Sequence, residues 1–144
     1  MRAAVVALVL GALSLTHAGE PAKEFDAIQG EWNVVEMVYN GKDLAQRYKL
    51  NFIFKGDTAM VEGDGAVKKE YAKLKFKFVA GTMPRCVDLT VAGGAQDDAK
   101  MEAIYDRKES ELRLCVRVFA LDRPSSFEAP AGSNNAYLRL KKVK

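Results

Sequence analysis

Apolar and polar residues alternate along most of the chain from Gly30 onward, with a period close to two. Successive side chains of a β-strand point to opposite faces, so this pattern is typical of strands with one buried face. Short turn sequences rich in glycine and aspartate separate the runs, which indicates an all-β domain. The eight predicted strands cover residues 31–39, 50–55, 58–62, 67–78, 85–91, 100–107, 112–119 and 136–143.

Two connections are longer than hairpin turns. Residues 42–49 contain good helix formers, and Leu44 and Tyr48 stand four residues apart, so the sequence predicts one short helix between the first two strands. Residues 120–135 form a long loop with two prolines. Long loops in small domains are usually functional or held by their own side chains, and we expect Phe127 to pack back onto the domain.

The fourth run alternates lysines with large apolar residues. It places Lys73, Lys75 and Lys77 on one face and Leu74, Phe76 and Phe78 on the other. We expect the apolar face to lie on the core and the lysines to lie in water. The alternative is a lysine stripe that binds a polyanion.

Eight consecutive antiparallel strands lose their exposed edges when the sheet closes, so the pattern predicts an eight-stranded antiparallel up-and-down barrel. Trp32, the only tryptophan, follows Gly30 at the start of the first run. We expect its indole ring to plug one end of the barrel, with Val34, Glu36 and Val38 on the same inward face. An alternative remains for Glu36, because a bulge in this strand would turn its carboxylate outward.

Several motifs along the chain point to a known family. In order they are Gln29-Gly30-x-Trp32-x-Val34-Val35, Asn40-Gly41-Lys42, Asp88-Leu89-Thr90, Ile104-Tyr105, Leu114-Cys115 and Arg123-Pro124-x-x-Phe127-x-Ala129-Pro130-Ala131-Gly132-Ser133. The Gly-x-Trp element is similar to the lipocalin and wider calycin signature. The whole order resembles an uncharacterised lipocalin-like domain family abundant in planctomycete bacteria, although Cys86 departs from the family pattern.

The resemblance implies a small exported or domain-linked β-barrel and no particular activity. In the calycin pattern, a basic residue of the last strand covers the tryptophan at the closed end of the barrel. Arg139 and Lys141 are the candidates for this cation, since both lie on one face of the final predicted strand.

Residues 1–18 have the composition of a secretory signal peptide. Arg2 precedes an apolar run from Ala3 to Leu15, and small residues near Ala18 offer a cleavage site. The run is shorter than the roughly 20 residues that a membrane-spanning helix needs, so an uncleaved anchor is the weaker alternative. We therefore expect a single mature domain, residues 19–144, exported to the periplasm or the extracellular space.

Cleavage would also remove Arg2 and His17, the only histidine. The remaining 21 basic residues nearly balance 19 acidic ones, which argues against nucleic acid as a partner. Without an imidazole the chain has no Ser-His or Cys-His pair, and its carboxylates lack the spacing of a calcium-binding loop. The sequence therefore predicts no catalytic residue, no metal and no cofactor, and a protein that is not an enzyme.

Cys86 and Cys115 fall on the fifth and seventh predicted strands. Two inter-strand spacings separate these strands by about 9.6 Å, whereas a disulfide needs Cα atoms within about 7 Å. We expect free thiols, with a disulfide as the alternative in an exported chain. Arg113 and Arg117 are expected to lie in water, with an anion-binding barrel interior as the alternative.

These observations predict a monomeric barrel that binds a small, partly apolar ligand in its open end. The candidate ligand-binding residues are Trp32, Val34, Glu36, Val38, Phe76 and Phe78. The alternative is a structural or protein-interaction module of the cell envelope, with a barrel filled by its own side chains. The size of the interior distinguishes the two, since ligand cavities begin at roughly 300 Å³.

Overall fold

The computed structural model describes residues 21–63, 65–118 and 122–144. The predicted signal peptide, residues 1–18, lies outside the described residues. Residues 21–28 are helical, and a second helix is α2 (Gly65–Tyr71). The strands are β1 (Gly30–Tyr39), β2 (Lys42–Asp43), β3 (Asn51–Lys55), β4 (Thr58–Glu62), β5 (Lys73–Val79), β6 (Arg85–Val91), β7 (Lys100–Lys108), β8 (Glu111–Arg117) and β9 (Asn135–Lys142).

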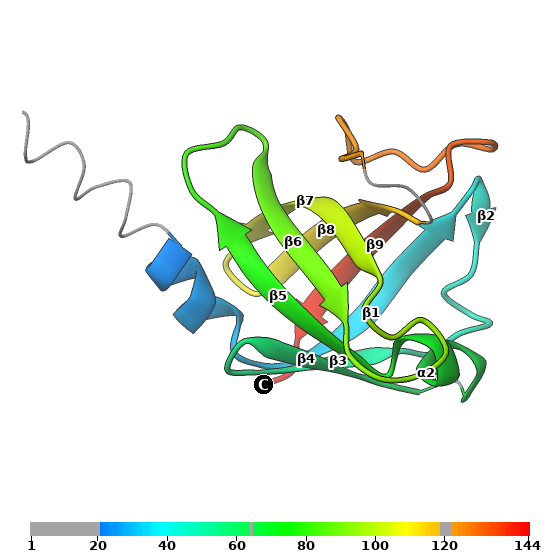
Figure 1. Cartoon of the computed structure of the whole chain (residues 1–144), viewed down its shortest axis with the longest axis horizontal. Helices are drawn as coiled ribbons and strands as arrows, with labels where there is room; N and C mark the ends of the chain where they lie inside the picture. Colours follow the sequence, from blue (N-terminus) through cyan, green and yellow to red (C-terminus); the bar gives the residue numbers. More distant parts are fainter. Residues whose placement is uncertain (1–20, 64, 119–121) are drawn as a thin grey trace, which may run out of the picture.

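The strands form one antiparallel sheet that closes on itself (Figure 1). From β3 to β9 each strand pairs with the next in the chain, and β1 pairs with both β3 and β9. Eight strands therefore make a closed barrel, as the sequence predicted. The two-residue strand β2 is additional and pairs only with the end of β1.

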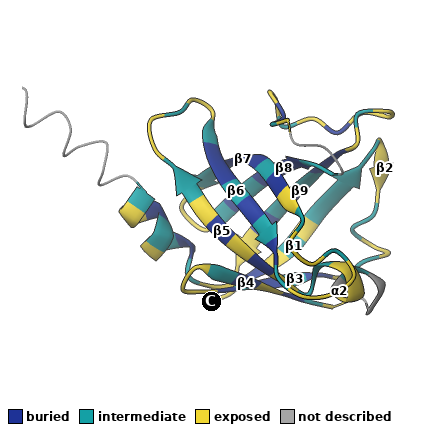
Figure 2. Ribbon diagram, in the orientation of Figure 1, coloured by how far each residue is buried: buried dark blue, intermediate teal, exposed yellow. Residues whose placement is uncertain are grey.

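Burial alternates along the strands, as Figure 2 shows. On β5, Leu74 and Phe76 are buried, whereas the lysines at 73, 75 and 77 are exposed. This arrangement agrees with the expectation that the lysines lie in water on the outer face of the barrel.

The short helix predicted over residues 42–49 is wrong. Residues 42–43 form β2, and the chain then makes a single turn in which the backbone N–H of Tyr48 donates to the carbonyl of Leu44 at 3.0 Å. One isolated turn fixes several backbone angles for very few hydrogen bonds, so it does not propagate without further packing.

The predicted strand over residues 67–78 is also wrong in its first half. Residues 65–71 form α2, and β5 begins only at Lys73. Val67 and Tyr71, four residues apart, both pack against the core from this helix. That spacing matches one helical face, so the helix is explained by burial of these two side chains.

The helix over residues 21–28 closes one end of the barrel. Ile28 is buried in the core, and the ring of Phe25 lies 6.0 Å from that of Phe76, measured between centroids. The side chain of Gln29 then accepts a hydrogen bond from the Gly56 N–H at 2.8 Å and donates one to the Gly56 carbonyl at 3.0 Å. These bonds fasten the end of the helix to the turn between β3 and β4.

A β-bulge interrupts β1. Val34 pairs with Leu140 and Glu36 pairs with Arg139, which leaves Val35 as the extra residue. Side chains alternate normally on either side of a bulge but exchange faces across it. Trp32 and Val34 therefore point inward before the bulge, whereas Met37 and Tyr39 point inward after it.

The loop after β8 packs on the outside of the barrel. Phe127 contacts a small buried cluster formed by Cys86, Ile104 and Cys115. This confirms the prediction that Phe127 packs back onto the domain. In the part of the chain that the structure describes, neither helix is long and apolar enough to traverse a lipid bilayer.

Candidate functional site

The barrel interior has two halves, and the half next to the helix over residues 21–28 is filled. Its aromatic rings form a continuous chain, with centroid separations of 5.4 Å for Phe54–Phe76, 5.5 Å for Phe76–Phe78 and 4.8 Å for Phe78–Tyr105. A void of only about 30 Å³ remains among them. That space is close to the volume of one water molecule, so this half offers no room for a ligand.

Trp32 lies within this filled half and is fully buried. Its indole N–H donates a 2.7 Å hydrogen bond to the carbonyl of Ile28, at the end of the helix over residues 21–28. The only polar atom of the side chain is therefore satisfied, and the ring joins the first strand to the helix that closes the barrel.

The cation over Trp32 is Lys142, which corrects the prediction of Arg139 or Lys141. The Lys142 Nζ lies 5.6 Å from the ring centroid and also donates to the Ala27 carbonyl at 3.2 Å. Trp32 is paired directly with Lys142 across the two strands. Lys142 belongs to the same face of β9 as the buried Leu138 and Leu140, whereas residues 139 and 141 face outward.

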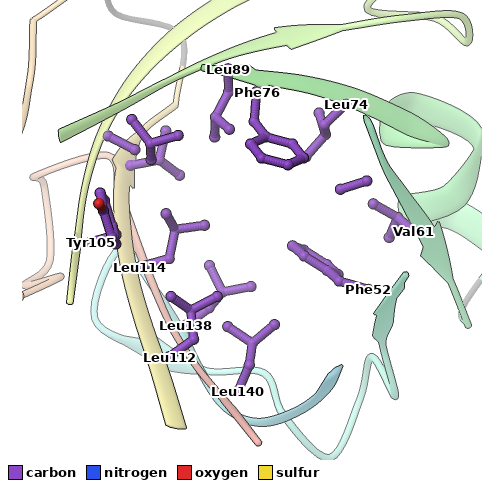
Figure 3. Close-up of a cluster of buried hydrophobic side chains, with 14 of the residues drawn as sticks. Phe52, Val61, Leu74, Phe76, Leu89, Tyr105, Leu112, Leu114, Leu138 and Leu140 are labelled. Atoms are coloured by element: carbon purple, nitrogen blue, oxygen red, sulfur yellow. The ribbon is translucent and has the colours of Figure 1, made fainter. Parts of the chain in front are cut away.

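The other half of the interior contains a cavity of about 270 Å³. In Figure 3, Phe52, Val61 and Leu138 point from different strands into the interior of the barrel. The cavity is slightly smaller than typical drug-sized sites and is suited to one small molecule. Its lining residues are Met37, Tyr39, Leu44, Tyr48, Leu50, Phe52, Val61, Val67, Glu70, Tyr71, Leu74, Leu89, Met101, Leu114, Val116, Val118, Ala136 and Leu138.

The bulge in β1 helps to create this space. Before the bulge β1 pairs with β3, but after it β1 pairs with the short β2 on that side. The segment between β2 and β3 contributes Leu44, Tyr48 and Leu50 to the cavity wall. At this point the wall of the barrel is therefore formed by a turn and its side chains, and not by a paired strand.

Helix α2 forms another part of the wall and is held at its C-terminal end. The Ala95 N–H, from the β6–β7 loop, donates to the carbonyl of Lys69 at 3.2 Å. Gly94 approaches so closely that a Cβ atom there would lie 2.6 Å from the same oxygen. This contact positions Glu70 and Tyr71 at the cavity.

Four polar side chains line the cavity: Tyr39, Tyr48, Glu70 and Tyr71. Within the described residues, no protein hydrogen bond engages the hydroxyl groups of these tyrosines or the Glu70 carboxylate. Burial raises the pKa of the Tyr71 hydroxyl above its usual value, and the negative charges of Glu70 and ionised Tyr39 raise it further. The surroundings of Tyr71 therefore disfavour a second negative charge.

None of the six predicted ligand-binding residues lines this cavity. Trp32 and Val34 pack in the core, and Phe76 and Phe78 belong to the filled half. Glu36 and Val38 are turned to the outside by the bulge. There the Glu36 carboxylate accepts a 3.0 Å hydrogen bond from the Arg139 guanidinium, which agrees with the alternative placement of Glu36.

The remaining candidate residues lie on the outer face. Arg113 pairs with Asp106 at 2.9 Å and covers the Phe127 ring at 4.4 Å, and Arg117 pairs with Asn135 and Asp122. These placements agree with arginines outside the barrel.

Cys86 and Cys115 are free and buried on either side of Ile104, as expected for strands two spacings apart. Burial raises the pKa of the Cys115 thiol to about 11. The thiolate, which is the reactive form, is therefore strongly disfavoured at neutral pH.

Sequence reasoning missed a buried ionic cluster around Glu24. Its carboxylate accepts hydrogen bonds from Arg85 at 3.0 Å and from Arg107 at 3.0 and 3.1 Å. Arg85 also pairs with Asp106, whose pKa is held below its usual value chiefly by the hydrogen bond from Arg113. Glu24 is 61 residues from Arg85 and 83 residues from Arg107 in the chain, so no local spacing predicts these contacts.

The described residues contain no group of three or more His, Cys, Asp or Glu side chains that could hold a metal ion. The geometry thus defines a closed antiparallel β-barrel with one filled end and one hollow, mostly apolar end. No family model, curated protein or solved structure matches the chain.

Proposed function

We propose that the protein is a lipocalin-like binding protein that holds one small, mostly apolar molecule in the hollow half of its barrel. The observation that carries the proposal is the 270 Å³ cavity, whose walls are formed mainly by aliphatic and aromatic side chains. Burial of apolar ligand surface contributes roughly 25 cal/mol per Å² before the costs of association. A small hydrophobic ligand has enough contact there for measurable affinity.

The proposed activity is binding without catalysis. The cavity lining that the structure describes contains no histidine, cysteine, serine or lysine. The described lining therefore offers none of the Ser-His, Cys-His or Ser-Lys pairs that covalent catalysis commonly uses. Three phenols and one carboxylate are suited to orienting a ligand by hydrogen bonds.

The binding proposal can be tested with the full chain and the neutral fluorescent probe N-phenyl-1-naphthylamine. We expect saturable fluorescence enhancement, and we expect Met37→Trp to weaken binding by about tenfold or more because the larger side chain occupies the cavity. Val38→Trp, the adjacent outward-facing position, is the matched control and should bind like the parent chain.

Circular dichroism and thermal unfolding establish that both variants are folded. Folded Met37→Trp protein with unchanged probe affinity would contradict binding in this cavity, as would a parent chain that does not bind the probe. Native mass spectrometry of protein purified from its own host would then identify a carried ligand.

We also propose that the protein is exported after removal of residues 1–18. The support is the charged and apolar pattern from Arg2 to Ala18. Cell fractionation followed by intact-mass measurement should find the chain outside the cytoplasm and beginning at Gly19. A cytoplasmic chain that retains its first eighteen residues would refute export.

A further inference from the structure

We infer that the cavity selects amphiphiles with a cationic polar end, such as an alkylammonium group, over amphiphiles with a carboxylate. This inference rests on the proposed binding function and adds the charge of the ligand. It follows from the uneven distribution of charge around the cavity.

The charged groups of the cavity wall are the first feature that favours a cation. Among the eighteen lining residues described by the structure, Glu70 alone carries a formal charge. A carboxylate ligand would meet Glu70 without a lysine or arginine among the described lining residues to pair with it. An ammonium ligand would meet an opposite charge. Glu70 is itself exposed at the edge of the cavity, so water screens part of both effects.

The aromatic rings of the cavity wall are the second feature that favours a cation. Tyr39, Tyr48 and Tyr71 line the same cavity as Glu70. The faces of aromatic rings attract cations, with a contribution of about 0.5–1 kcal/mol at exposed sites and about 2 kcal/mol where water is excluded. One of these rings already attracts a cation, since the Arg47 guanidinium lies 5.3 Å from the centroid of Tyr48.

The tyrosine hydroxyl groups of the cavity wall are the third feature, because they can form hydrogen bonds with a ligand. The three tyrosine hydroxyls and the Glu70 carboxylate make no hydrogen bond to protein atoms within residues 21–63, 65–118 and 122–144. Their polar atoms are therefore available to a ligand, in exchange for water. The pKa of Tyr71 is raised first by burial, which opposes a charge of either sign, and then by the negative charge of Glu70, which opposes an anion in particular.

Arg47 is the group that would favour the opposite selectivity. It is exposed and does not line the cavity, but its guanidinium lies beside Tyr48. A carboxylate that reached past the cavity mouth could pair with it. The experiment therefore includes a variant at this position.

The test compares three amphiphiles of equal chain length by isothermal titration calorimetry with the full chain: octyltrimethylammonium, octanol and octanoate. We expect the cation to bind about tenfold more tightly than octanoate, from one ion pair and one or more ring contacts. Glu70→Gln should reduce this preference severalfold and leave octanol affinity unchanged. Glu128→Gln removes the same charge from the exposed loop after β8 and should change nothing.

The outcomes separate this inference from the binding proposal. If octanol binds but octyltrimethylammonium does not bind more tightly than octanoate, the charge preference is wrong and the binding proposal stands. A preference for octanoate that disappears in Arg47→Gln would assign an anionic polar end instead. A cation preference of undiminished size in folded Glu70→Gln protein would overturn the role of Glu70. If none of the three amphiphiles binds, the binding function itself fails.

Discussion

The backbone N–H of Gly41 donates a 2.6 Å hydrogen bond to the carbonyl of Ala129. Two motifs that are far apart in the sequence, Asn40-Gly41-Lys42 and the Ala-Pro-Ala-Gly-Ser stretch, therefore meet in space. The Asn134 N–H also donates to the Asn40 side-chain oxygen at 3.1 Å. The loop after β8 is thus fixed to the end of β1, beside the hollow half of the barrel.

Substitution of Gly41 should show how tightly this contact is packed. Gly41 has a φ of +84°, and a Cβ atom there would lie 2.9 Å from the backbone nitrogen of Ala131. We expect Gly41→Ala to lower the free energy of unfolding by about 2–3 kcal/mol, from backbone strain and the displaced loop. Urea denaturation measures this change.

Gly56→Ala is the control, since its φ is +62° but a Cβ atom would meet nothing within 4 Å. This variant should lose only about 1 kcal/mol of unfolding free energy, which is the cost of the left-handed backbone conformation. Equal losses in the two variants would show that the contact with Ala131 has no energetic weight.

Removal of the Glu24 charge should loosen the helix over residues 21–28. The Glu24 side chain is 10% exposed and is paired with Arg85 and Arg107. We expect Glu24→Gln to lower the free energy of unfolding by about 2 kcal/mol. This loss lies between those typical of exposed and of fully buried ion pairs. Asp26→Asn, on the exposed side of the same helix, should leave the urea midpoint unchanged.

Replacement of Trp32 should be costly even when the substitute is aromatic. Trp32→Phe leaves the buried Ile28 carbonyl without its donor and creates a void, so we expect a loss of about 2–4 kcal/mol. Lys142→Met retains most of the aliphatic cover and should lose about 1 kcal/mol or less. Urea denaturation followed by far-UV circular dichroism measures the loss of unfolding free energy in both variants. A smaller loss for Trp32→Phe than for Lys142→Met would contradict this order.

The position of α2 should control ligand affinity. Gly94 contacts the Lys69 carbonyl at the end of α2, whereas a Cβ atom at Gly93 would meet nothing within 4 Å. Both glycines have positive φ, so both alanine variants bear similar backbone strain. We expect Gly94→Ala to weaken binding of N-phenyl-1-naphthylamine severalfold more than Gly93→Ala does.

The Cys115 thiol should make stability depend on alkaline pH. Its pKa rises to about 11 in the folded chain from 9.0, so folding favours the protonated thiol. The stabilisation is complete below pH 9 and is lost as pH rises toward 11, a change of roughly 2–3 kcal/mol. We expect urea denaturation to show a shallower decline over this interval for Cys115→Ala than for the parent chain, and parallel curves would contradict the assignment.

The barrel was predictable from sequence because period-two alternation marks strands directly. On β5, for example, the alternation identified both the buried and the exposed residues correctly. The sequence allowed a bulge in this strand as an alternative for Glu36, but it did not fix the position of the bulge, because Val34 and Val35 are both apolar and the pattern does not show which of them is the extra residue. That single residue reversed the predicted directions of Glu36 and Val38 and moved Met37 and Tyr39 into the cavity.

The position of the cavity depended on contacts that no local pattern contains. Val67 and Tyr71 have helical spacing, but no glycine, proline or other turn residue separates them from the alternating strand that follows. Leu44 and Tyr48 have the same spacing and make only one turn. Tertiary packing decides whether such a segment forms a helix or only a single turn. The residues that pack at the barrel opening are distant in the chain.

The division of the barrel interior separates the residues that maintain the fold from those that would choose a ligand. Trp32, Glu24 and the chain of phenylalanine rings secure one end, while Tyr39, Glu70 and Tyr71 surround the other. Substitutions at well-separated positions have nearly independent energetic effects. Descendants of this chain can therefore exchange residues around the hollow end and acquire new ligand preferences while the filled end continues to supply their thermodynamic stability.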